Sequence, residues 1–431
     1  MRATLICLHY PPEPSGNAPY SGALAEGLVA RGMDVQVVTG LPHYPQWRVY
    51  DGFEKGGTEF RNGVPVSRRR HPVPANPRLI SRLGMELAFG LRALTANWQR
   101  PDVVVLVSPA LFSSMLVAFR AVVSRRPFVV WVQDFYSLGA AEAGQAGASQ
   151  SRLLAAAEHL LFSRARAVVV IHERFKRAVV TRLRVDPDKV VVIRNWSHVA
   201  DLVEESLDTR NLMRQELGWP DNVTVVLHAG NMGVKQGLAN VVEAAKIAER
   251  DNQPLVFVLM GDGNQRAALE AMGTTACLQF IAPVPQDVFT AVLAAADVLL
   301  VNERPGVKDM SVPSKLTSYF ATGLPIIAAT DSESVTAEEI EASGAGTRID
   351  ADRPELIVKA AMQLRNSPQT ARALGRRGLA FRRSYLSADS SLDSFHKLLL
   401  RLIMNSSRGP NGSAIDENSP LMEQTKSVDC V

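Results

Sequence analysis

Short apolar runs alternate with longer amphipathic stretches along most of the chain. This alternation is typical of a parallel, doubly wound α/β sheet, because buried parallel strands read as continuous β-branched runs that helices connect. The first series of predicted strands is 5–8, 35–39, 103–107, 128–132, 167–171 and 190–193. The second series is 223–227, 255–260, 278–281, 298–301 and 326–329.

A polar stretch without predicted strands, 197–222, separates the two series. We therefore predict two Rossmann-like α/β domains, 1–198 and 199–380, that face each other across a cleft. An amphipathic helix within 381–404 is expected to return to the first domain. The Ser-, Gly-, Asn- and Pro-rich remainder, 405–431, is predicted to be disordered.

The composition narrows the class of protein. The chain has 431 residues, 46% of them hydrophobic, which fits a soluble globular protein of two or more domains. Its three cysteines, Cys7, Cys277 and Cys430, are far apart, so a disulfide framework or a zinc site is not indicated and a cytoplasmic location is expected. The apolar start is too short for a secretory signal. The net charge of +4 is mild, and we expect no nucleic-acid partner.

One uncharged run, 103–119, approaches the length of a membrane span. Ser108-Pro109 divides it, so a strand, a turn and a helix are the better interpretation. Between Arg61 and Arg126 there are eleven arginines but only two acidic residues. Because apolar residues are interleaved with them, we hypothesise that region 68–100 lies on the inner leaflet of the cytoplasmic membrane. A solvated basic helix face explains the pattern equally well.

Several predicted strands end in polar residues. Ligands of open α/β sheets bind beyond the carboxyl ends of the strands, so these side chains are candidates for a site. Each one alone is more often a loop hydrogen-bonder, but several that converge on one cleft indicate a site. They are His9, Gln133, Asp134, His172, His228, Asn302 and Glu303.

Glycine-rich loops occur in both predicted domains. Gly16 and Asn17 lie in the first loop, which lacks the nicotinamide or flavin fingerprint G-x-G-x-x-G, and a Walker lysine motif is also absent. The loop 230–238 follows a predicted strand and precedes a predicted helix, and Gly261 and Gly263 follow the next strand. Such loops let backbone amides approach a phosphate, although a tight turn alone would also need the glycines.

Residues 312–328 read as a helix start, a short helix, a glycine stop and a buried strand. Pro313 cannot sit inside a helix and Ser314 is a good N-cap, so free amides of the first turn attract an anion. Lys315 adds a full positive charge, and Ser311 lies just before this start. The simpler alternative is an ordinary capped helix.

These motifs together resemble the retaining GT-B glycosyltransferases of family 4, over nearly the whole chain to about Met404. The motifs are 230–238, Gly261-Asp262-Gly263, Pro313-Ser314-Lys315 and Gly323-Leu324-Pro325, in the family's order and spacing. The chain looks most like the bacterial branch that builds capsular, colanic-acid-type and O-antigen polysaccharides.

The sequence departs from the family pattern at the donor site. The family's diphosphate-binding Arg and Lys fall at Asn231 and Gln236, with Lys235 adjacent. The positions of the family's two paired glutamates are occupied here by Met310 and Ser318, neither of which is acidic. The second glutamate binds the ribose in the family, and Ser318 could offer only a hydroxyl in its place. We hypothesise that Lys315 and the helix start replace the missing positive charge.

The resemblance implies transfer of a sugar, with retention, from a UDP-sugar to a polysaccharide or lipid-linked oligosaccharide. The leaving diphosphate would help to deprotonate the acceptor, and no metal or cofactor is expected. Asp134, near the sugar, and Lys315 are the expected catalytic residues. The expected substrate-binding residues are His9, Gly16, Asn17, Gln133, His172, Asn231, Lys235, Gln236, Gly261, Gly263, Ser311, Pro313, Ser314 and Ser318. A nucleotide-sugar 2-epimerase of the same fold and a non-catalytic nucleotide-sugar-binding partner are the alternatives.

Overall fold

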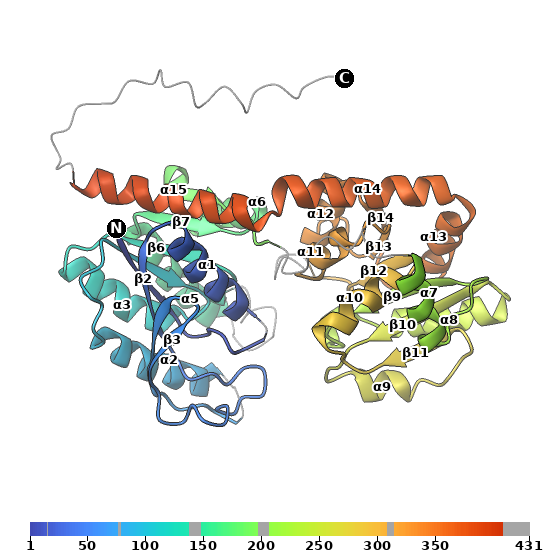
Figure 1. The fold of residues 1–431 in the computed structure, drawn as a ribbon, viewed down its shortest axis with the longest axis horizontal. Helices are drawn as coiled ribbons and strands as arrows, with labels where there is room; N and C mark the ends of the chain where they lie inside the picture. Colours follow the sequence, from blue (N-terminus) through green and yellow to red (C-terminus); the bar gives the residue numbers. More distant parts are fainter. Residues whose placement is uncertain (15, 76–78, 138–147, 197–206, 308–313, 408–431) are drawn as a thin grey trace, which may run out of the picture.

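The computed structural model describes residues 1–14, 16–75, 79–137, 148–196, 207–307 and 314–407, and they form two α/β domains side by side (Figure 1). The first domain is built on an eight-stranded sheet of order β3-β4-β2-β1-β5-β6-β7-β8. The second is built on a six-stranded sheet of order β11-β10-β9-β12-β13-β14. All strand pairs are parallel except β3 with β4. The expected pair of Rossmann-like domains is therefore confirmed.

The strands of the first domain are β1 (Arg2–Cys7), β2 (Asp34–Thr39), β3 (Gly57–Arg61), β4 (Val64–Arg68), β5 (Val103–Val107), β6 (Phe128–Val132), β7 (Ala167–Val170) and β8 (Val190–Val192). Its helices are α1 (Ala18–Ala30), α2 (Leu79–Leu94), α3 (Leu111–Val123), α5 (Ala148–Arg164), α6 (Glu173–Thr181) and the short η1 (Pro187–Lys189). The uncharged run 103–119 thus forms a strand and most of a helix, as expected, and within the described residues no helix is long and apolar enough to cross a membrane.

The strands of the second domain are β9 (Thr224–Ala229), β10 (Leu255–Met260), β11 (Leu278–Ile281), β12 (Val298–Asn302), β13 (Ile326–Ala329) and β14 (Gly346–Ile349). Its helices are α7 (Leu207–Leu217), η2 (Val234–Gln236), α8 (Ala239–Arg250), α9 (Arg266–Glu270), α10 (Gln286–Ala295), α11 (Ser314–Ala321), α12 (Val335–Ser343), α13 (Pro354–Asn366) and α14 (Pro368–Tyr385). The boundary expected between 198 and 199 falls outside the described residues.

The last helix, α15 (Ala388–Ser407), packs on the first domain. Its apolar face, which includes Phe395 and Leu399, belongs to the core cluster of the first domain, and the Phe395 ring lies 4.9 Å from that of Trp131. α14 instead contacts α11 and α13 of the second domain, so the chain crosses between Tyr385 and Ala388 (Figure 1). The expected return of the C-terminal helix is confirmed. The helix includes residues 405–407, which the sequence had placed in a disordered tail, because their helical hydrogen bonding continues that of α15.

Candidate functional site

The loops that follow β9 and β10 are packed directly against each other. Gly261 has a φ of +141°, and a Cβ placed on it would lie 1.9 Å from the carbonyl oxygen of Gly230. A Cβ on Gly263 would lie 2.5 Å from the carbonyl oxygen of Met232, whose amide donates to the Asp262 carbonyl at 2.8 Å. Both glycines are therefore required by the approach of two protein backbones, independently of any ligand.

The loop 230–237 is supported from within the domain. The side chain of Gln236 accepts a hydrogen bond from the Gly233 amide at 3.0 Å. Asn302, at the end of β12, donates to the carbonyl oxygens of Gln236 and Gly237 at 2.7 and 3.0 Å. Asn231 and Lys235 are exposed. The loop thus fixes its own shape with Gln236 and presents Asn231 and Lys235 to the outside.

Lys315 lies in the first turn of α11, beneath this loop. Its Nζ is 3.3 Å from Nε2 of His228 and 3.8 Å from the position of a Cβ on Gly230. Burial lowers the pKa of Lys315 to about 8, although the charge of Glu303 opposes this shift. Burial and then the charge of Lys315 hold the pKa of His228 well below its usual range. A half-buried ammonium beside a glycine-rich loop and a helix start is suited to a phosphate.

The other predicted residues of this region are only partly described. Ser318 is half-buried on α11, on the same short helix as Lys315. Ser311 and Pro313 lie outside the described residues. Ser314 is the first helical residue of α11, one position after the N-cap that the sequence predicted it to be. Its side chain lies outside the described part of the structure.

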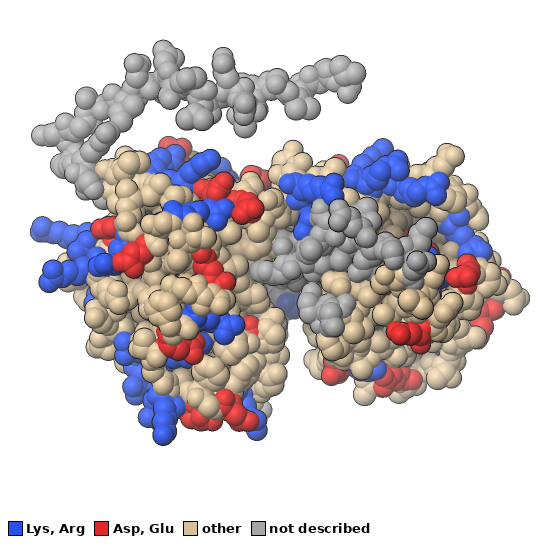
Figure 2. All heavy atoms as spheres, viewed as in Figure 1, with Lys and Arg blue, Asp and Glu red and all other residues tan. Residues whose placement is uncertain are grey.

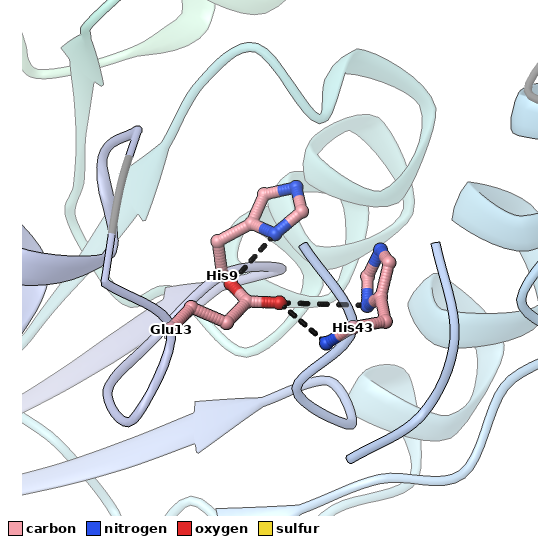
Figure 3. A group of neighbouring side chains, drawn as sticks. All are labelled: His9, Glu13 and His43. Atoms are coloured by element: carbon pink, nitrogen blue, oxygen red, sulfur yellow. Dashed lines mark hydrogen bonds and ion pairs between the residues drawn. The ribbon is translucent and has the colours of Figure 1, made fainter. Parts of the chain in front are cut away.

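In the first domain, the Glu13 carboxylate organises the loops after β1 and β2 (Figure 3). Its Oε1 accepts from the amides of His43 and Tyr44 at 2.7 and 2.9 Å, and its Oε2 lies 2.8 Å from Nδ1 of His9. Burial raises the pKa of Glu13, but these hydrogen bonds outweigh burial and bring the pKa below its usual value. Because the acceptor is a carboxylate, Nδ1 of His9 donates this hydrogen bond, and Nε2 points away from Glu13 (Figure 3).

Ligand atoms of His9, Glu13 and His43 all lie within 4.8 Å of one another, as metal ligands would. However, Glu13 already accepts from two amides, and Nδ1 of His43 is 2.7 Å from the Leu41 carbonyl oxygen, to which it donates. A cation would have to break these hydrogen bonds. The cluster is therefore better explained as a set of hydrogen bonds that holds two loops together than as a metal site.

A chain of hydrogen bonds connects the first loop to Asp134. The side-chain amide of Asn17 donates to the backbone carbonyl oxygen of Ser108 at 3.0 Å. The Ser108 hydroxyl donates to the backbone carbonyl oxygen of Asp134 at 2.8 Å. Asp134 also accepts from the Phe135 amide at 2.8 Å. Gly16 has a φ of +66° and lies against the Tyr44 ring. Four of the predicted residues, His9, Gly16, Asn17 and Asp134, are thus gathered near the carboxyl ends of β1, β5 and β6.

His172 has a different environment from the one expected of a substrate contact. The side chain is buried, its Nδ1 accepts from the Arg174 amide at 3.1 Å, and its Nε2 is 2.8 Å from Glu339 of the second domain. Arg194 donates to the same carboxylate at 2.5 Å. Both ring nitrogens are therefore occupied by protein groups, and the contact of Nε2 with Glu339 joins the two domains. No sequence motif pointed to Arg194 or Glu339, because a pairing between domains depends on the tertiary structure.

A pocket between the domains lies close to predicted site residues of both domains. Gln133, next to Asp134, forms a reciprocal amide pair with Asn195 at 2.7 and 3.1 Å. Asn195 lines the pocket together with Leu316 and Thr317, which directly follow Lys315. Figure 2 shows the notch between the domains. The partner of Gln133 and the residues that follow Lys315 therefore line the same interdomain pocket.

Family models match both domains. Residues 15–196 match the glycosyl transferase 4-like domain, and residues 209–380 match the glycosyl transferases group 1 domain. A relative in Escherichia coli K12, WcaI, is named for glycosyl transfer in colanic acid biosynthesis; it is 31% identical over 75% of this chain and 82% of its own length. The 2-deoxystreptamine N-acetyl-D-glucosaminyltransferase of Streptomyces fradiae is 27% identical over 64% of this chain and 66% of its own.

Solved structures share the fold at low sequence identity. Anabaena HepE, in complex with UDP, has a TM-score of 0.70 at 15% identity and covers 93% of this chain and 100% of its own. WaaG, a glycosyltransferase involved in lipopolysaccharide biosynthesis, has a TM-score of 0.66 at 17% identity and covers 92% of this chain and 99% of its own. The chain is a GT-B glycosyltransferase of group 1 with a glycosyl transferase 4-like N-terminal domain.

Proposed function

We propose that this glycosyltransferase transfers a sugar from a UDP-linked donor to a polysaccharide or lipid-linked oligosaccharide, with retention and without a metal ion. The observation that carries the proposal is the half-buried Lys315 ammonium, at the start of α11 and beneath the loop of Gly230. A fixed cation at a helix N-terminus is the arrangement that a leaving diphosphate requires. The UDP and UDP-glucose complexes of HepE support the choice of uridine.

The proposed reaction exchanges two bonds at the anomeric carbon. The bond to the diphosphate oxygen breaks while the acceptor hydroxyl bonds to the same face of the sugar, and its proton passes to the leaving diphosphate. Lys315, Asn231 and Lys235 stabilise the developing charge. Asp134 and the loop of Gly16 and Asn17, linked through Ser108, orient the sugar and the acceptor.

The test begins with the donor. UDP, GDP, ADP and TDP are compared by thermal shift, since a ligand that binds only the native state raises the melting temperature. We expect the largest rise with UDP, and a larger rise with another nucleotide would exclude uridine. UDP release from UDP-sugars, with bacterial membrane lipids as acceptor, is then measured with and without EDTA. Loss of activity in EDTA would overturn metal independence. Epimerised donor in the absence of acceptor would favour the 2-epimerase, which the family matches do not favour.

We further propose that the enzyme acts in the cytoplasm against the inner leaflet. α2, α3 and α5 pack side by side, and their exposed apolar residues include Ile80, Phe119 and Leu153, with exposed fractions of 83%, 67% and 72%. The acidic residues of these helices, Glu86 and Glu158, are both buried. Exposed charge on the three helices is therefore positive, as an anionic lipid surface requires.

The structure changes which part of the basic region is available for this contact. Arg68, at the start of region 68–100, is buried, pairs with Glu59 at 2.6 Å and lies over the Phe53 ring. It therefore cannot reach a bilayer, because its charge is already neutralised inside the domain. Figure 2 shows lysines and arginines at the edge of the first domain where Figure 1 places α2 and α3.

Sedimentation with vesicles tests the membrane proposal. Vesicles of anionic phosphatidylglycerol should carry the protein down at low salt, and neutral phosphatidylcholine vesicles should not. Phe119→Glu should reduce binding by placing a negative charge in the apolar face, whereas Phe60→Glu, an equally exposed phenylalanine on the edge strand β3, should not. Equal sedimentation of both variants would locate the contact elsewhere.

A further inference from the structure

The sheet of the second domain opens between β9 and β12 at its carboxyl edge. The pairing of these two strands ends at Leu227 and Leu299, although β9 continues to Ala229 and β12 to Asn302. On their other sides both strands stay paired to these last residues, β9 with β10 and β12 with β13. β10 and β12 lie on opposite sides of β9, so the opening is the point at which the strand order reverses, where open α/β sheets bind ligands.

The Tyr319 hydroxyl of α11 lies in this opening. Its oxygen accepts from the Ala229 amide at 2.8 Å and is 3.3 and 3.5 Å from the carbonyl oxygens of Ala229 and Leu300, to which it can donate its proton. The side chain is completely buried, and burial raises the pKa of the hydroxyl, so the proton is retained at neutral pH. Because buried backbone groups require partners, the hydroxyl replaces hydrogen bonds that β9 and β12 do not make with each other.

Tyr319 and Lys315 contact consecutive residues of β9. Four positions separate them on α11, so their side chains lie on one face of this helix, one turn apart. The Lys315 Nζ is 3.3 Å from Nε2 of His228, and the Tyr319 hydroxyl is bonded to Ala229, the next residue of the strand. α11 has only eight residues. A shift of this short helix relative to β9 would therefore change both contacts together.

We propose that Tyr319 is a positioning residue for the donor diphosphate: its hydroxyl holds α11 against the end of β9 and so keeps the Lys315 ammonium beneath the Gly230 loop. The inference rests on the proposed function. Tyr319 acts through Lys315, because a completely buried side chain cannot itself reach the donor. Its ring belongs to the core cluster of the second domain, so the ring serves the fold and the hydroxyl serves the position of the helix.

Tyr319→Phe and Thr322→Val separate positioning from stability. The Thr322 hydroxyl is also buried, and it donates to the Tyr319 carbonyl at 2.7 Å and accepts from the Leu324 amide at 3.1 Å, at the end of α11 away from Lys315. Both substitutions remove one such hydroxyl and nearly keep the side-chain volume, so both variants should fold and show a similar fall in urea midpoint.

The affinity for UDP-glucose, measured by titration calorimetry, should differ between the two variants. We expect a loss of about fivefold in Tyr319→Phe, because the ammonium is displaced rather than removed, and of less than about twofold in Thr322→Val. Unchanged affinity in Tyr319→Phe would overturn the proposal. An equal loss in the two variants would also overturn it, because the effect would then come from general destabilisation of the helix.

The same measurement in the Lys315→Met background tests whether Tyr319 acts through Lys315. Adding Tyr319→Phe to Lys315→Met should cause no further loss of affinity, since two residues that act through one contact are not additive. A further loss as large as that in the unmodified background would contradict the proposal, because the hydroxyl would then act on the donor by another route.

Proton uptake on binding UDP-glucose at pH 8 gives a readout that reduced stability alone would not change. Burial lowers the pKa of Lys315 to about 8, and a displaced α11 would expose the ammonium and return this pKa toward its usual value. Tyr319→Phe should therefore take up fewer protons than the unmodified protein, whereas Thr322→Val should take up as many. Equal uptake in all three proteins would show that the hydroxyl does not set the environment of Lys315.

The unmodified protein and Lys315→Met separate failure of this inference from failure of the proposed function. If the unmodified protein does not bind UDP-glucose, the proposed function fails and the inference falls with it. If UDP-glucose binds and Lys315→Met weakens the binding while Tyr319→Phe does not, only the inference about Tyr319 fails.

Discussion

The Nζ of Lys315 lies 3.3 Å from Nε2 of His228, although the two residues belong to α11 and β9 and are 87 positions apart in the chain. Burial lowers the pKa of both groups, to about 8 for Lys315 and well below the usual range for His228. At neutral pH the lysine is therefore largely charged and the histidine is neutral, so the histidine orients the ammonium without competing for the proton. An anion bound beside this ammonium would receive a strong, preorganised interaction.

Replacing Lys315 with methionine keeps the length of the side chain and removes its charge. We expect the affinity for UDP-glucose, measured by titration calorimetry, to fall about 10- to 100-fold, because a hydrogen bond to a charged group contributes about 1.5–3 kcal/mol. Lys246→Met is the matched control, since Lys246 lies on α8 of the same domain and pairs only with Glu243 among the described contacts. Equal affinity in the two variants would remove Lys315 from the donor site.

Donor binding should also take up protons at pH 8. Lys315, with a pKa of about 8, is protonated in about half of the molecules at this pH. A bound diphosphate would raise this pKa, so the molecules with a neutral Lys315 would each take up a proton on binding. Calorimetry of UDP-glucose in buffers of different ionisation enthalpy should give an uptake of up to about half a proton per site. The uptake should disappear in Lys315→Met and diminish at pH 6.5. Release of protons at pH 8 would contradict the assignment.

Most of the sheet could be predicted from the sequence because its central strands are apolar throughout. All five residues of β5 and of β6 are buried, and a continuous β-branched run of this kind has few alternative structures. The strands that were missed, β3, β4 and β14, contain polar or half-exposed residues. β3 (Gly57–Arg61) is mostly exposed and pairs antiparallel at the edge of the sheet, so neither hydrophobic content nor the βα alternation reveals it.

The site could be predicted only as positions along the chain. The rule that ligands bind beyond strand ends located His9, Gln133, Asp134 and His172, but their partners depend on tertiary structure. His172 pairs with Glu339, 167 residues away, and Gln133 with Asn195, 62 residues away. The sequence likewise predicted a close approach at Gly261, but it could not distinguish a ligand from the backbone of Gly230.

The contact between His172 and Glu339 should make the domain interface sensitive to acid. Burial raises the pKa of Glu339, but the hydrogen bond from His172 and the charge of Arg194 outweigh it and lower the pKa below 4.5. The resulting stability is present above pH 4.5 and is lost as pH falls through the lowered value. Glu339→Gln should lower the free energy of unfolding at pH 7 by about 2 kcal/mol. In calorimetric scans, the difference in stability between Glu339→Gln and the unmodified protein should shrink at pH 3. The control Glu341→Gln, at an exposed position of α12, should be as stable as the unmodified protein at both pH values.

Glu86 should have the opposite dependence on pH. Burial raises its pKa to about 7, so the folded state favours the protonated carboxyl, and the cost of ionising it grows between pH 4.5 and 7. Glu86→Gln should therefore stabilise the protein by up to about 3 kcal/mol at pH 8 and by little at pH 4.5. Urea unfolding at the two pH values checks this, and an equal gain at both would show that ionisation is not the cause.

Gly261 should tolerate no side chain, because two protein loops meet there. An added Cβ would lie 1.9 Å from the Gly230 carbonyl oxygen, and the φ of +141° is unfavourable for any other residue. Gly273 has a φ of +110° but no atom within 4 Å of its Cβ position, so Gly273→Ala isolates the backbone strain, about 1 kcal/mol. Gly261→Ala should cost several times more, about 4 kcal/mol or above, measured as a lower urea midpoint of the second domain. Equal losses in the two variants would mean that the loops separate readily and that their contact does not hold the Gly230 loop over Lys315.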